Sequence, residues 1–197
     1  AAHTGDERFL EAGRGALAFE SSHFSAEAGG WPDLRVWPDQ PLPPGGAFSA
    51  IWCHGAAGGA LARLRADALD PSPRLRTEAE RAVAACRDAA AADPGEGDRT
   101  LCHGAAGIGE ALLAGAEALG APDLARAAVD LAERHLAAEE RGAVPRSGLP
   151  SGAETPALML GSAGFAYHLL RLCAPDRVPS VLQVAGTARR VAGRAAA

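Results

Sequence analysis

Apolar residues recur at helical spacing along most of the chain, which predicts a succession of α-helices. The clearest case is the segment from Gly104 to Leu119, where the apolar positions follow one another at steps of four, four and three residues: Ile108, Leu112, Ala116 and Leu119. Gly120 comes next, and glycine is the residue that most often ends a helix because it adopts the left-handed conformation without strain. We therefore predict a helix over residues 104–119.

The same periodicity predicts five further helices, over residues 6–19, 55–69, 74–92, from 122 onward, and 161–173. Leu61, Leu64 and Ala68 are expected to share one face of the second helix. One stripe of the helix that begins at Pro122 is formed by Leu124, Ala128 and Leu131. Proline and glycine are dense in residues 29–46 and 142–156, which predicts two long loops. Residues 178–182 are predicted to be extended.

One octapeptide pattern occurs twice and returns a third time in altered form. Residues 52–59 (WCHGAAGG) recur as residues 101–108 (LCHGAAGI), and residues 159–165 (MLGSAGF) keep the glycines but lose the Cys-His pair. Each copy precedes a predicted helix, and a further helix separates it from the next copy. A unit of about fifty residues built from two helices is typical of helical arrays and rings.

The composition favours closely packed helices and argues against several classes of partner. Of the 197 residues, 48% are hydrophobic but only 5% are aromatic, which disfavours a β-sandwich. The net charge is −5 and no basic cluster stands out, so neither nucleic acid nor a membrane surface is expected as a partner. We predict an all-α domain over residues 1–182 and a disordered tail over residues 183–197.

The first residues carry neither a methionine nor the pattern of a signal peptide. We therefore expect a piece of a longer protein that works in the cytoplasm. In a reducing compartment cysteine more often serves metal binding or catalysis than disulfide formation.

Two Cys-His dipeptides, Cys53-His54 and Cys102-His103, occupy equivalent places in the first two repeats. Because the helix starts of such a ring face one centre, we expect the two pairs to meet. Thiolate and imidazole together select Zn²⁺, and a helix N-terminus favours the thiolate. Two arrangements stay open: a closed structural site that uses all four side chains, or an open site with three ligands and a place for water or substrate.

These motifs resemble the lanthionine cyclase (LanC-like) family. Residues 52–58 and 101–107 look like its two zinc motifs, and residues 156–167 are similar to its final repeat. Residues 31–35 (WPDLR) and 174–182 (APDRVPSVL) resemble the C-terminal part of the class II lanthipeptide synthetases (LanM type). The resemblance covers nearly the whole chain, though only the last part of such an enzyme.

The resemblance implies an α/α toroid with a central zinc ion, of which this chain would form the C-terminal part. Cys53, Cys102 and His103 match the zinc ligands, and His54 matches a position near the reaction that does not coordinate. The implied activity is the addition of cysteine thiols to dehydroalanine or dehydrobutyrine, which closes (methyl)lanthionine rings. The implied partners are a dehydrated precursor peptide and the missing N-terminal part of the same enzyme. Because the addition ends with protonation of a carbon, His54 is the candidate general acid.

One feature departs from the family pattern. The family's arginine shortly before the first zinc cysteine has no counterpart, because Ser49 and its neighbours are uncharged.

Alternative functions are a noncatalytic helical module with a structural Cys2His2 zinc site, or an inactive fragment. Trp31 and Arg35 are expected to anchor their loop or to contact a peptide. The other candidates are predicted to be structural: small packing cysteines (Cys86, Cys173), satisfied histidines (His135, His168), and glutamates on solvated faces (Glu78, Glu80, Glu133, Glu139, Glu140).

Overall fold

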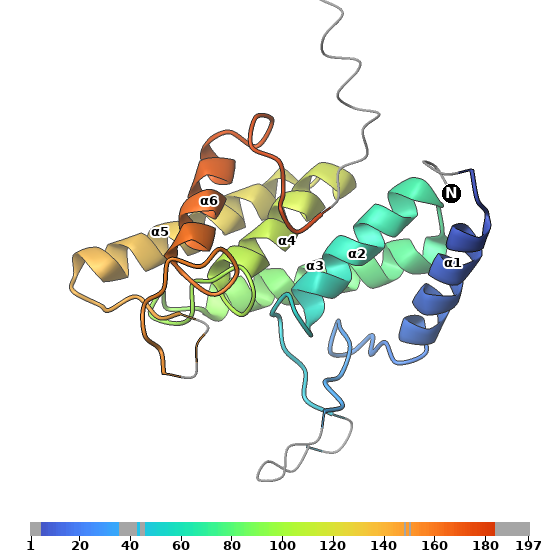
Figure 1. Ribbon diagram of the computed structural model, residues 1–197, viewed down its shortest axis with the longest axis horizontal. Coiled ribbons are helices and arrows are strands. Elements are labelled where there is room, and N and C mark those ends of the chain that lie inside the picture. Colours follow the sequence, from blue (N-terminus) through green and yellow to red (C-terminus); the bar gives the residue numbers. More distant parts are fainter. Residues whose placement is uncertain (1–4, 36–42, 44–45, 148, 150, 184–197) are drawn as a thin grey trace, which may run out of the picture.

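The computed structural model describes residues 5–35, 43, 46–147, 149 and 151–183. Within these residues the chain forms six α-helices and no strand (Figure 1): α1 (Arg8–Ser21), α2 (Ala56–Leu69), α3 (Pro73–Ala92), α4 (Ala105–Leu119), α5 (Pro122–Glu140) and α6 (Ser162–Cys173). The predicted all-α class is confirmed, and the helix ends lie close to the predicted ones. Gly120 ends α4 in the left-handed conformation, as predicted. Residues 178–182 are irregular and not a strand. Of the predicted tail over residues 183–197, Gln183 is described and donates a hydrogen bond to Leu61, while residues 184–197 lie outside the described residues.

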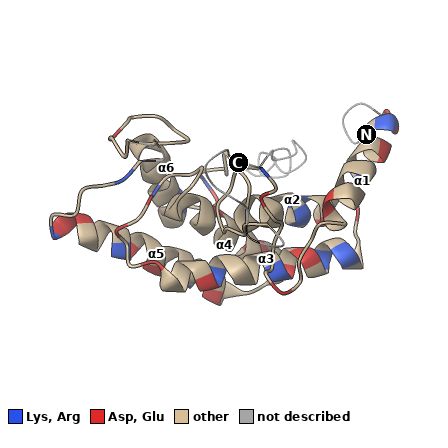
Figure 2. Cartoon of the chain, turned by 90° about the horizontal axis from the view of Figure 1, so that it is seen from below, with Lys and Arg blue, Asp and Glu red and all other residues tan. Residues whose placement is uncertain are grey.

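The helices form two layers, one of α2, α4 and α6 and one of α3 and α5 (Figure 2). α2 packs on α3 and α4 packs on α5, while α4 also contacts both α2 and α6. The layer of α3 and α5 carries much of the charge, whereas α4 and α6 are almost free of it (Figure 2). This division matches the helix-pair repeat predicted from the sequence, with α2, α4 and α6 each following one copy of the glycine motif. None of the described helices is both long and apolar enough to cross a membrane.

Alanine supplies much of the core between the layers. Ala60, Ala82 and Ala111 are fully buried, and larger residues such as Leu112 and Leu131 fill the space between them. Small side chains allow helix axes to approach closely, and each fully buried leucine contributes about 1.5–3 kcal/mol. The low aromatic content of the chain is therefore compatible with a well-packed interior.

The buried face of α2 differs from the predicted one. Leu61 and Leu64 are buried as predicted, but Ala68 is exposed. Arg63 and Asp67 are buried instead, because each meets an oppositely charged side chain on α3. A pattern that scores only apolar residues cannot identify such positions, since burial depends on the partner.

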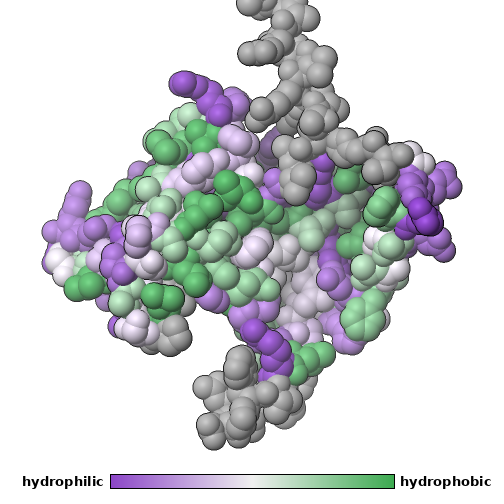
Figure 3. Space-filling view, in the orientation of Figure 1, coloured by the Kyte–Doolittle hydropathy of each residue, from purple (hydrophilic) through white to green (hydrophobic). Residues whose placement is uncertain are grey.

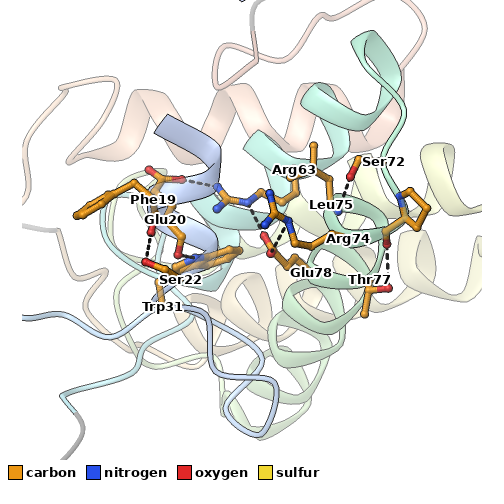
Figure 4. A network of polar contacts seen from close by, with 11 residues as sticks. Phe19, Glu20, Ser22, Trp31, Arg63, Ser72, Arg74, Leu75, Thr77 and Glu78 are labelled. Atoms are coloured by element: carbon orange, nitrogen blue, oxygen red, sulfur yellow. Dashed lines mark hydrogen bonds and ion pairs between the residues drawn. The ribbon is translucent and has the colours of Figure 1, made fainter. Parts of the chain in front are cut away.

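Glu78 is one of these partners, so its predicted solvated position is wrong. Its side chain is 5% exposed, and the Arg63 Nε atom donates a hydrogen bond to Glu78 Oε2 at 3.0 Å. Arg63 also pairs with Glu20 of α1 and lies over the ring of Trp31 at 4.3 Å (Figure 4). The remaining glutamates predicted to face solvent are exposed: Glu80, Glu133, Glu139 and Glu140.

Isolated cysteines and histidines mostly take the predicted structural places. Cys86 is fully buried in α3, and its packing role is confirmed. His135 and His168 are buried, and each contacts a carboxylate. Cys173 is exposed at the end of α6, so the prediction that it packs is wrong. It is the last residue of the helix.

The first helix is attached by polar contacts. No residue of α1 is buried, and Phe9 and Phe19 are 63% and 68% exposed. Arg14 pairs with Asp70 at 2.7 Å across the gap to the end of α2. A hollow lined by residues of both helices lies between α1 and α2.

Candidate metal centre

The three glycine motifs fold into the same turn. The N-cap glycines Gly55, Gly104 and Gly161 all have extended backbone angles, with φ of −149°, −126° and −152°. In each turn the next residue donates its N–H to the carbonyl seven residues earlier, at 2.9 Å in all three: Ala56 to Ser49, Ala105 to Asp98, and Ser162 to Thr155. The repeat seen in the sequence is therefore a repeat of backbone geometry.

The second glycine of each motif lies in the first turn of its helix, where no side chain fits. A Cβ added at Gly58, Gly107 or Gly164 would overlap the carbonyl oxygen six residues earlier in the chain. The tight approach folds each turn back over the start of its helix. This explains why the third copy keeps the glycines although it lacks the Cys-His pair.

The three turns stack at equivalent positions. The N–H of Cys53 donates to the carbonyl of Cys102 at 3.4 Å, and the N–H of Cys102 donates to the carbonyl of Met159 at 3.0 Å. Cys53, Cys102 and Met159 occupy equivalent positions in the three repeats. The backbone thus places the first two cysteines side by side, as predicted from the ring arrangement.

Cys53, Cys102 and His103 each offer one ligand atom, and these atoms lie within 4.8 Å of one another. In the described part of the chain this is the one group of three or more such residues that could hold a metal ion. The donor set of two sulfurs and one nitrogen suits zinc. His103 Nδ1 is also buried without a hydrogen-bond partner, a costly arrangement for a polar atom. The residues present therefore fit a zinc ion.

His54 does not join this group. Its Nδ1 atom lies 3.0 Å from Cys53 Sγ, and its Nε2 atom lies 3.5 Å from Asp33 Oδ2. Burial and the charge of Arg35 lower the pKa of His54, and the charge of Asp33 acts in the opposite direction. Three of the four side chains of the closed arrangement, which the sequence left open, lie in this group, and His54 is the fourth.

Asp33 and Arg35 enter the site from the loop before α2. The sequence predicts that Arg35 anchors its loop or contacts a peptide, and it assigns no role to Asp33. Arg35 Nη2 lies 2.6 Å from Asp33 Oδ2, and this hydrogen-bonded pair lowers the pKa of Asp33 well below its usual range. Asp33 is held by a backbone bridge to Ala47. Arg35 interacts electrostatically with Cys53 and His54, so a cation is present although none precedes Cys53 directly. The motif in residues 31–35 was the available signal.

Burial opposes the thiolate at the second cysteine. Burial, together with the neighbouring Cys53 thiol, raises the pKa of Cys102 to about 12. The expected effect of the helix N-terminus is therefore outweighed at this position. A bound cation would be required to stabilise the Cys102 thiolate at neutral pH.

A groove of about 1120 Å³ extends from this site between α1 and α2. Its lining includes Cys53 and His54, just before α2, and Leu69, the last residue of α2, and the hollow beside α1 is visible in Figure 3. Trp31 lines its wall and anchors the loop, because its Nε1–H donates to the carbonyl of Glu20 at 3.0 Å. The candidate metal centre is thus reached through an open, largely apolar channel.

Comparison with known proteins assigns the chain to a family. A search of curated proteins finds no match. The model of the family described as "Lanthionine synthetase C-like protein" matches residues 1–183, nearly the whole chain. The all-helical fold and the repeated glycine turns agree with this match. The chain belongs to the lanthionine synthetase C-like family.

Proposed function

We propose that this chain is the zinc-dependent cyclase part of a class II lanthipeptide synthetase of the LanM type, acting in the cytoplasm. It would add cysteine thiols of a dehydrated precursor peptide to dehydroalanine or dehydrobutyrine and so close (methyl)lanthionine rings. The observation that carries the proposal is the convergence of Cys53, Cys102 and His103 from two separate turns. An N-terminal part of the same enzyme would be its other partner.

Cys53, Cys102 and His103 are the residues that would hold the metal. Three protein ligands are typical of a catalytic zinc site, whereas structural sites are usually closed by four. Zinc would supply one effect here: it stabilises a bound thiol as the thiolate, which is the nucleophilic form. His54, held between Cys53 and Asp33, stays outside the ligand set.

The addition requires one new bond and one proton transfer. The thiol gives up its proton, its sulfur bonds to the β-carbon of the dehydroamino acid, and the electron pair of the double bond moves to the α-carbon and its carbonyl. The α-carbon then takes a proton, so the product has the same atoms as the two reactants. We assign the delivery of this proton to His54, because its ring lines the groove beside Cys53.

Asp33 and Arg35 would support this step from the preceding loop. The Asp33 carboxylate lies 3.5 Å from His54 Nε2 and so holds the ring in one orientation. Arg35 places a positive charge near Cys53 and His54, where negative charge develops on the carbonyl oxygen during the addition. Apolar walls such as Trp52 and Leu61 would exclude water from the reacting atoms.

Metal binding by separate variants tests the ligand assignment. We expect Cys53→Ser, Cys102→Ser and His103→Asn each to lose zinc, measured as metal per chain after gel filtration. His54→Asn and the exposed Cys173→Ser are matched controls that keep it. X-ray absorption should show two sulfurs, one nitrogen and an exchangeable oxygen. A shell of two sulfurs and two histidine nitrogens would overturn the proposal in favour of a structural site.

Ring closure is tested with a synthetic peptide that carries one cysteine and one dehydroalanine. Because the reaction does not change the peptide mass, unreacted thiols are counted by alkylation with N-ethylmaleimide. We expect the zinc-loaded chain to consume the thiol and His54→Asn to slow this by roughly 100-fold or more while keeping the metal. Full metal binding with no thiol consumption by the wild-type chain would support the noncatalytic or inactive alternatives.

A further inference from the structure

The segment after α6, residues 174–183, runs from α6 across α4 to α2, and we call it the C-terminal strap. In Figure 1 it leaves the end of α6 and returns across α4 toward α2. Tyr167 Oη donates a hydrogen bond to the carbonyl of Pro179 at 2.8 Å, and Arg171 donates to the carbonyl of Val178. Gln183 Nε2 then donates to the carbonyl of Leu61 in α2 at 3.0 Å. The strap is therefore fixed at both ends although it contains no regular structure.

A buried carboxylate fastens the middle of the strap. Glu110 of α4 is 1% exposed and accepts hydrogen bonds from His168 Nδ1 and Arg171 Nε, both at 2.9 Å. Its other oxygen accepts a hydrogen bond from Ser180 Oγ at 2.8 Å, and Ser180 Oγ in turn accepts one from the N–H of Leu182 at 3.2 Å. The proposed ring closure uses none of these groups. A buried acid with this many partners fixes the path of the chain at Leu182.

Leu182 is the point at which the strap reaches the candidate site. It packs against both apolar clusters of the molecule and lines the groove that Cys53 and His54 also line. Val181, its neighbour, is 42% exposed and does not line the groove. Two residues of the strap, Leu182 and Gln183, therefore line the groove, and Leu182 is the apolar one, held in place by Glu110 and Ser180.

We propose that Leu182 is a specificity-determining residue of the groove, and that Glu110 is a positioning residue that acts through Ser180 and the strap. The inference rests on the proposed function for its consequence, which is selection of the side chain beside the reacting thiol. Leu182 would admit flat or small neighbours and limit branched or bulky ones, because it occupies volume on one wall. The geometric part of the inference holds for any reagent that enters the groove.

Alkylation of Cys53 in the full chain tests the geometric part without any catalytic assay. The probes are iodoacetamide and the bulkier N-phenylmaleimide, with modification at each cysteine followed by peptide mass spectrometry. We expect Leu182→Trp to slow N-phenylmaleimide at Cys53 by about tenfold and iodoacetamide by much less. The exposed Cys173 serves as the internal reference, and Val181→Trp is the matched control with unchanged rates.

The positioning role is tested by Ser180→Ala, which removes the link between Glu110 and the strap. We expect faster modification of Cys53 by the bulky probe, and faster amide hydrogen exchange in residues 178–183, with the exchange of α4 unchanged. Equal effects of Leu182→Trp and Val181→Trp would overturn the inference. So would a Ser180→Ala variant with wild-type rates at Cys53.

The synthetic peptide assay tests the consequence for substrates. With a bulky residue next to the cysteine, Leu182→Ala should lower KM by roughly tenfold with kcat nearly unchanged, and with a glycine neighbour KM should change much less. The same KM change for both peptides would overturn the specificity role. If no variant forms a thioether, the proposed function fails, whereas the alkylation results still decide whether the strap forms the groove wall.

Discussion

The two Cys-His turns have the same sequence and the same backbone but occupy different surroundings. The turn before α2 lies at the groove: Cys53 is exposed, and His54 contacts Asp33. The turn before α4 lies under the third turn: Cys102 is partly buried, and His103 Nδ1 has no partner. Repetition therefore supplies the geometry of a metal centre, while the neighbours of each copy divide the chemistry between them.

This difference separates what a repeat requires from what a site requires. All three copies keep the glycines, because the turn cannot form without them. Only the first two carry the Cys-His pair, and only the first faces the loop that bears Asp33 and Arg35. His54 contacts the Asp33 carboxylate, which suits a role in proton delivery. His103 Nδ1 has no such partner, which suits a role in metal binding.

The largest expected effect comes from the backbone that the turns share. Gly58→Ala and Gly107→Ala should each destabilise the fold by about 4 kcal/mol or more, because the added methyl group overlaps a carbonyl oxygen. Urea unfolding followed by circular dichroism measures this. Gly13→Ala in α1 is the control: its added methyl group meets open space, so it should be neutral or stabilising by about 0.5–1 kcal/mol. A well-folded Gly107→Ala variant would show that the shared turn is not obligatory.

Metal removal is expected to have the next largest effect and to sharpen the contrast between the turns. Stripping zinc with a chelator should lower stability by about 3 kcal/mol when free zinc had been near 100 times its dissociation constant. Without metal, Cys102→Ser should destabilise more than Cys53→Ser, because Cys102 is partly buried and Cys53 is exposed. Thermal melts with and without chelator measure both effects. Equal melting temperatures for the two metal-free variants would contradict the prediction that the more buried Cys102 contributes more to stability.

The sequence predicted the helices well because their signals are local. Apolar spacing, a proline at the start of α5 and a glycine after α4 each act within a few residues. It failed where burial depends on a distant partner: Arg63 and Glu78 are buried because they meet across two helices. Charge alone suggested solvent at Glu78, and no local pattern distinguishes a paired charge from a free one.

For the site, the repeat located both Cys-His pairs and predicted that they meet. The resemblance gave His54 a non-coordinating position, but the sequence could not show its contact with Asp33, which lies 21 residues away in a proline-rich loop. The strap is also a tertiary feature: Glu110 and Ser180 lie seventy residues apart. Residue types and spacing identify candidate ligands, whereas the contacts that orient them arise only from folding.

A smaller loss of stability is expected on acidification, and it comes from Glu110 in α4, the helix that follows the second turn. Burial alone would raise the pKa of Glu110, but the hydrogen bond from His168 and the charge of Arg171 outweigh it and lower the pKa. A lowered pKa in the folded state gives stability above the ordinary glutamate pKa of about 4.3, and this stability is lost as the pH falls below it. Melting temperatures between pH 7 and pH 3 should show this decline. In Glu110→Gln the decline should be shallower, and an unchanged slope would contradict the assignment.

The smallest expected effect changes no stability and compares the two cysteines directly. In the metal-free chain, Cys53 should react with iodoacetamide at least about tenfold faster than Cys102, because its sulfur is exposed while Cys102 is partly buried with a raised pKa. The chain carries its own scale: the exposed Cys173 marks the fast limit, and the fully buried Cys86 marks the slow one. Modification of each cysteine is followed by peptide mass spectrometry. If Cys102 reacts as fast as Cys173, the second turn is as open to solvent as the first. The contact between His54 and Asp33 would then be the one remaining difference between the surroundings of the two turns.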